Sequence, residues 1–202
     1  VEGMPLESLL AGVPYDWRTF GEYLDRLDGN LAVNAGFLVG HSALRRVVMG
    51  ENAVGNAASP EQVEAMARLL GESIAAGGLG FSSSQATTHN DGDGDPVPSR
   101  SATPDELVEL SAEAGRHEGT TLEFIPAVGG FNEEHLDLMA RMSKAADRPL
   151  NWNVLVPNAA RAEYAWTALG ASDYAAARGG RVLALTLPDV MRTHLTFKAG
   201  FV

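Results

Sequence analysis

The chain has 202 residues, of which 45% are hydrophobic and 20% charged, so it can bury a core and lacks the composition of a disordered protein. A formal net charge of -11 disfavours contact with a phosphate backbone, and we expect no nucleic acid partner. The absence of cysteine excludes disulfides within the chain and suits a cytoplasmic protein. No apolar run approaches the roughly 18 to 20 residues of a membrane span, and the first residues lack the basic and apolar parts of a signal peptide.

Five short apolar runs are typical of strands that are covered on both faces, because each is too short for a free-standing helix. They span residues 33–39, 79–83, 121–125, 150–156 and 182–187. Helical sequence separates them. Ser59-Pro60 and Thr103-Pro104 each place a capping residue before a proline at the first helical position.

Two further helices are expected on similar grounds. Asn132 precedes two glutamates, which suit a helix N-terminus, and apolar residues then recur at helical spacing up to Arg148. A last helix is predicted from about 158 to 178, before Gly179-Gly180. The alternation predicts five consecutive parallel strands that are joined by right-handed helical crossovers.

Two α/β architectures fit this alternation. A doubly wound sheet usually carries a glycine-rich turn after its first strand, but no Gly-x-Gly-x-x-Gly follows any of the runs. A (β/α)₈ barrel needs eight strands and about 250 residues, so this chain would be part of one.

Three segments resemble the N-acyl-D-amino-acid deacylases (D-aminoacylases) of the amidohydrolase superfamily. They are VNAGFLVGHSALRRVVMG at 33–50, GLGFSS at 78–83 and SATPDEL at 101–107. The resemblance implies a metal-bearing (β/α)₈ barrel, of which residues 1–202 would form a single partial domain containing about strands three to seven. It also implies a hydrolase of a non-peptide C–N bond in a small molecule, such as an N-acyl-D-amino acid, which metal-activated water would attack. Because the chain starts without Met and ends in an apolar segment, we expect a fragment that is inactive by itself.

The sequence departs from this family at two strands where the family carries single histidine metal ligands. Here they read TTLEFIP at 120–126 and LNWNVL at 150–155, without histidine. Glu123 is the one strong ligand type on either strand, and it could bind metal, act as a base or pair with an arginine. We expect zinc in the full-length protein, with ligands that are not evident in this chain, and we assign no metal ligand here.

Residues at the C-terminal ends of barrel strands face the mouth of the active site, and this rule selects the candidates. His41 and Glu123 are the catalytic candidates, with a satisfied core histidine as the alternative for His41. The serines could instead bond backbone groups in a turn, and the asparagines could be a buried polar pair. The substrate-binding candidates on the strands are Ser82, Ser83, Asn151 and Asn153.

Residues 84–102 form a long polar segment that is rich in turn residues, and we expect a mobile loop on the catalytic face. His89 and Arg100 flank it and could bind a substrate carboxylate. Its alternating aspartates lack the glutamate that a calcium loop requires. His117 and His135 are expected on the surface, and His194 receives no role.

Two other functions stay open. The barrel could lack a metal and bind a small amide or carboxylate ligand without turnover. Alternatively, the chain could be inert: five strands cannot close a barrel, so exposed sheet edges would favour a homo-oligomer or association with missing barrel segments.

Overall fold

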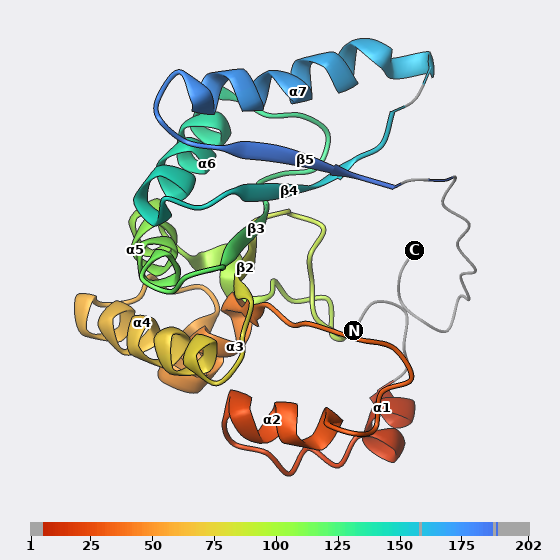
Figure 1. The fold of residues 1–202 in the computed structure, drawn as a ribbon, viewed down its shortest axis with the longest axis vertical. Helices are drawn as coiled ribbons and strands as arrows, with labels where there is room; N and C mark the ends of the chain where they lie inside the picture. The colour runs from red at the N-terminus through yellow and green to blue at the C-terminus, as the bar shows by residue number, and fades with distance from the viewer. Residues whose placement is uncertain (1–5, 158, 188, 190–202) are drawn as a thin grey trace.

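In the computed structural model, residues 6–157, 159–187 and 189 are described, and they form a single parallel sheet with helices packed against it (Figure 1). The strands lie side by side in the order in which they occur in the sequence. They are β1 (Val39–Gly40), β2 (Gly80–Ser84), β3 (Thr121–Ile125), β4 (Leu150–Leu155) and β5 (Val182–Thr186). A doubly wound sheet reverses its strand order at a switch point, whereas this sequential order is that of a barrel wall.

Helices connect the strands and also precede the sheet. The α-helices are α1 (Leu6–Gly12), α2 (Phe20–Leu27), α3 (His41–Met49), α4 (Pro60–Ala75), α5 (Pro104–Gly115), α6 (Glu133–Ala146) and α7 (Ala162–Ala176). Short 3₁₀ turns are η1 (Gly50–Ala53), η2 (Pro98–Ser101) and η3 (Ala159–Arg161). None of the helices in the described part of the chain is long and apolar enough to cross a membrane.

The predicted helix starts are confirmed by their capping hydrogen bonds. The Ser59 hydroxyl accepts from the Gln62 N–H and the Thr103 hydroxyl from the Glu106 N–H. Asn132 caps α6, and the ring of His135 accepts from the Asn132 N–H in return. His135 is therefore a half-buried capping residue, because its position at the third residue of the helix places the ring beside the free N–H groups of the first turn.

Most predicted strands differ from the observed ones by one or two residues, but the prediction of a strand over 33–39 is wrong for most of its length. Only Val39 and Gly40 pair with β2. Before them, Val33 is 75% exposed, and the Leu79 N–H donates to the Phe37 carbonyl in an isolated bond. The segment thus reaches the sheet only at its end. The last helix starts at Ala162 rather than 158, after the η3 turn.

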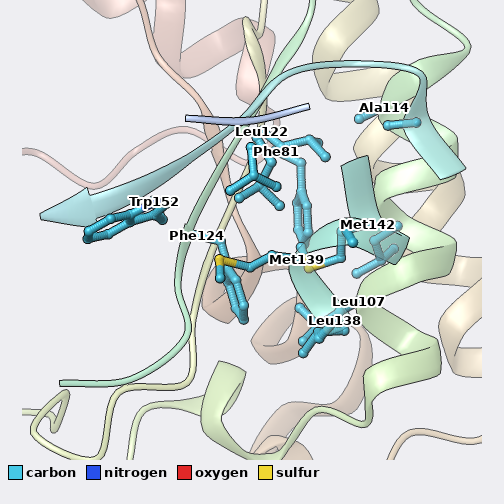
Figure 2. Packing of buried hydrophobic residues seen from close by; sticks show 14 of the residues in the cluster. Phe81, Leu107, Ala114, Leu122, Phe124, Leu138, Met139, Met142 and Trp152 are labelled. Carbon is cyan, nitrogen blue, oxygen red and sulfur yellow. The ribbon is translucent and has the colours of Figure 1, made fainter. Parts of the chain in front are cut away.

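The core lies between one face of the sheet and the helices α4 to α7. Alternate strand residues point to this face, and Phe81, Leu122 and Phe124 are all fully buried. Figure 2 shows them directed toward the apolar side chains of α5 and α6. Burial of each such side chain stabilises the fold by about 1.5–3 kcal/mol. We call the opposite face of the sheet the inner face; the residues between these apolar ones point toward it.

Candidate active site

The inner face carries a row of polar side chains at the centre of the sheet. In the strand register, Ser82 of β2 lies beside Glu123 of β3, and Glu123 lies beside Asn151 of β4. Neighbouring parallel strands are about 4.8 Å apart, so these three side chains fit against one small ligand. All three are half-buried. The register therefore places these three residues on one face of the sheet.

Hydrogen bonds fix the orientation of the two asparagines. Asn153 Nδ2 lies 2.5 Å from Glu123 Oε1, and an ionised carboxylate only accepts, so the amide group of Asn153 must donate. Asn151 Nδ2 donates to Thr121 Oγ1 at 3.2 Å, and that hydroxyl donates to the Pro149 carbonyl at 3.3 Å. The row therefore presents the Glu123 carboxylate, which is held in place by the Asn153 amide. It also presents the amide of Asn151, a group type that can both donate and accept hydrogen bonds.

His41 and Ser83 lie on the other side of the sheet, in a buried network with two residues that the sequence analysis missed. His41 Nδ1 lies 2.8 Å from Ser83 Oγ, and His41 Nε2 lies 2.8 Å from Glu106 Oε1. Arg45 Nη1 lies 2.6 Å from both carboxylate oxygens of Glu106. The side chains of His41, Arg45 and Glu106 are at most 1% exposed. We call these four residues the buried network.

The electrostatics of the buried network fix its protonation. Burial lowers the pKa of His41, and this outweighs the attraction of Glu106, so the imidazole is neutral at pH 7. Burial alone would raise the pKa of Glu106, but hydrogen bonds from His41 and Arg45 lower it below its usual value. His41 Nε2 consequently donates to the Glu106 carboxylate, and Nδ1 accepts from the Ser83 hydroxyl.

The prediction that His41 and Ser83 face the active-site mouth is wrong, because of the two-residue alternation of a strand. Ser83 shares its face of β2 with Phe81, toward the helices, and the His41 ring packs edge-on against the Phe81 ring at 5.3 Å. A hydroxyl, an imidazole and a carboxylate in series resemble a hydrolytic triad, yet Ser83 is only 7% exposed and Glu106 is paired with Arg45. The buried network therefore positions elements instead of meeting substrate.

A sequence signal for the missed residues exists. Arg45 follows His41 by four residues, which places both on one face of α3. Glu106 is in the first turn of α5, where an acidic side chain is common because it stabilises the helix N-terminus. The sequence therefore contains no separate sign that Glu106 is buried.

The loop at 84–102 brings His89 and Arg100 together. Arg100 Nη1 donates to the His89 carbonyl at 3.4 Å and also to the side chain of Asn90. The ends of the loop are joined: Gln85 Nε2 donates to the Ala102 carbonyl at 2.9 Å, and Ser99 Oγ donates to the Ser84 carbonyl at 2.7 Å. The mobility of the loop residues between these hydrogen bonds stays a prediction.

Among the described residues, no group of three or more His, Asp or Glu side chains could hold a metal ion. The loop aspartates do not converge on a cation, because Asp91 Oδ1 accepts from the N–H groups of Asp93 and Asp95. His117 lies 3.6 Å from Glu113 on α5. His194 falls outside the described residues. On this part of the chain, Glu123 is the carboxylate of the inner face, and one carboxylate with neutral amides is not a complete site for zinc.

A parallel sheet in sequential order, helices on one face and polar groups on the other define a segment of a (β/α)₈ barrel. A model of the amidohydrolase family matches residues 10–194, and the chain belongs to this family. Both the fold class and the family resemblance predicted from the sequence are thereby confirmed.

Two relatives show how much of a longer protein this chain represents. A D-aminoacylase of Alcaligenes xylosoxydans xylosoxydans is 32% identical over 147 residues, which cover 72% of this chain and 28% of that protein. An uncharacterized protein of Mycobacterium tuberculosis (strain H37Rv) is 36% identical over 138 residues, which cover 63% of this chain and 22% of that protein. The chain thus spans less than a third of either relative.

Solved structures of D-aminoacylase share the fold. One, described for the functional role of its binuclear metal centre, is 25% identical with a TM-score of 0.63 and covers 81% of this chain and 32% of its own. Another, a D-aminoacylase mutant in complex with CuCl₂, is 24% identical with a TM-score of 0.69 and covers 94% of this chain and 38% of its own. This likeness supports the assignment of the sheet to part of a barrel.

Proposed function

We propose that this chain is part of an amidohydrolase that cleaves a non-peptide C–N bond in a small molecule, such as the acyl bond of an N-acyl-D-amino acid. Membership of the amidohydrolase family and the D-aminoacylase relative support this proposal. The observation that carries it is the row of Ser82, Glu123 and Asn151 on the inner face, because this face leads to the C-terminal strand ends at which barrel enzymes bind their substrates.

Within this row, Glu123 is the group that can move a proton. Its carboxylate would take a proton from water and give it to the leaving nitrogen, while Asn153 fixes the position of Oε1. Asn151 and Ser82, on either side, would orient the amide of the substrate. His89 and Arg100 of the loop would bind its carboxylate.

For the whole protein, we propose that water activated by a metal ion, zinc, attacks the substrate. The D-aminoacylase described for its binuclear metal centre supports the use of a metal in this family. Because the described residues do not form a metal site, we derive no step of the reaction through a metal. The second candidate is a metal-free barrel that binds a small amide or carboxylate, and the absence of histidine from β3 and β4 is the feature behind it.

The test combines metal content with hydrolysis. Zinc, nickel, manganese and iron are measured on this chain and on any longer polypeptide that its gene encodes, together with release of acid from a panel of N-acetyl-D-amino acids. In an active polypeptide, Glu123→Gln should reduce hydrolysis about 100-fold or more. Glu109→Gln, which removes an exposed carboxylate from α5, is the matched control and should change little. Binding without metal or turnover would favour the second candidate.

A further inference from the structure

The buried network is the largest group of buried polar side chains that the proposed reaction does not use. It joins three elements: His41 and Arg45 belong to α3, Ser83 to β2, and Glu106 to α5. It therefore holds the C-terminal end of β2 at the point where the loop at 84–102 begins.

Arg45 extends this connection to the turn that follows α3. Its guanidinium donates to the Ala53 carbonyl at 3.1 Å and to the Asn56 carbonyl at 2.6 Å. Next to these carbonyls, the Gly55 N–H donates to Ser101 Oγ at 2.8 Å. Ser101 ends η2, the last turn of the loop. The buried ion pair is thus linked to the far end of the loop.

A second connection reaches the same turn through Ser99. Its N–H donates to Ser42 Oγ of α3 at 3.2 Å, and its hydroxyl donates to the Ser84 carbonyl of β2 at 2.7 Å. Ser99 is 2% exposed, so its bond to Ser84 is shielded from water, while its bond to Ser42 is partly buried. Both ends of the loop are consequently fixed to elements that the buried network joins.

We infer that the buried network, with Ser99 and Ser101, is a clasp that positions the loop at 84–102 at the C-terminal end of β2. Glu106 and Arg45 are its positioning residues, and Ser99 and Ser101 transmit the position to the loop. The clasp confines motion to the loop residues between its hydrogen-bonded ends, and His89 is one of these residues. Its effect on substrate binding rests on the proposed function, but the positioning itself does not.

Hydrogen exchange measures the positioning directly. In Ser99→Ala, and more strongly in the double variant Ser99→Ala with Ser101→Ala, amides of residues 86–98 should exchange on the order of 10-fold faster, while those of β3 and β4 keep their rates. Ser111→Ala is the matched control, since Ser111 is also buried but its hydroxyl bonds to Leu107 within α5. It should leave the loop rates unchanged.

These variants leave the buried ion pair of Arg45 and Glu106 intact, so the test does not depend on a variant that fails to fold. Unchanged loop exchange in the double variant would overturn the clasp, and so would equal acceleration across the sheet. In a hydrolytically active polypeptide, the double variant should raise KM for N-acetyl-D-amino acids about 5-fold or more, with kcat within 2-fold. Loop exchange that changes as expected in a polypeptide without hydrolysis would contradict the proposed function and retain the clasp.

Discussion

Arg45 and Glu106 form an ion pair in which one nitrogen of the guanidinium, Nη1, lies 2.6 Å from each carboxylate oxygen. Both side chains are withdrawn from water, with 0% and 1% exposure. The remaining guanidinium nitrogens bond to backbone carbonyls, of Ala53 and Asn56. The pair is therefore fully hydrogen-bonded, which is the condition under which a buried ion pair is tolerated.

Removal of one partner should be costly. We expect Arg45→Met to lower the free energy of unfolding by about 3–5 kcal/mol, because the carboxylate of Glu106 would stay buried without its cation. Arg46→Met is the control, since Arg46 is the next residue of the same helix, has a side chain that is 42% exposed and lies 3.7 Å from an exposed glutamate. Urea denaturation measures both variants; a similar small loss in the two would show that the pair is not a structural requirement.

Stability should also fall on acidification, in two windows. The pKa of His41 is lowered in the folded chain, so below about pH 6.5 the unfolded chain binds a proton that the folded chain does not. The pKa of Glu106 is lowered as well, and its contribution is lost further down, as the pH falls below 4.5 toward the folded pKa. Both groups thus favour folding at higher pH.

The measurement is the free energy of unfolding at pH 7, 6 and 5. The contribution of His41 approaches a slope of about 1.4 kcal/mol per pH unit below pH 6.5. In His41→Gln this part of the slope should disappear. An unchanged slope in this variant would mean that His41 is protonated within the folded network.

Two helical glycines should respond in opposite directions to alanine. At Gly115 of α5, a Cβ would lie 2.1 Å from the Ala146 carbonyl oxygen of α6, so Gly115→Ala must push the helices apart. We expect it to destabilise the fold by at least about 1–3 kcal/mol. At Gly170 of α7, nothing lies within 4 Å, and alanine should stabilise the helix by about 0.5–1 kcal/mol. Thermal unfolding of both variants decides whether α5 and α6 pack this closely.

The edge strand β5 leads to a prediction about association. Leu183 and Leu185 are 38% and 39% exposed, and among the described strands β5 pairs only with β4. An exposed apolar edge favours pairing between chains. We expect light scattering to show a dimer or larger species, and Leu185→Lys to shift the population toward monomer. A monomeric parental chain at the same concentration would contradict the prediction.

Local signals in the sequence were sufficient to predict most of the helices and strands around the sheet. Capping residues such as Ser59 and Thr103 act within one helical turn, and alternate apolar residues on a strand such as 121–125 show which side is buried. These signals predicted the helices α4 to α7, four of the five strands and the shared face of Asn151 and Asn153, but not the helices α1 and α2. The first strand was overestimated because an apolar run does not by itself supply a hydrogen-bonding partner.

The sequence by itself thus determined the alternation of strands and helices, the parallel connection of the strands and the shared face of Asn151 and Asn153. Alternation already places Ser82 and Ser83 on opposite faces of β2, and only the tertiary structure decided which of them faces the helices. It also decided the partners of His41, which are 42 and 65 residues away in the chain. Burial and long-range pairing set the protonation and role of such a group, and neither is encoded within a local stretch of residues.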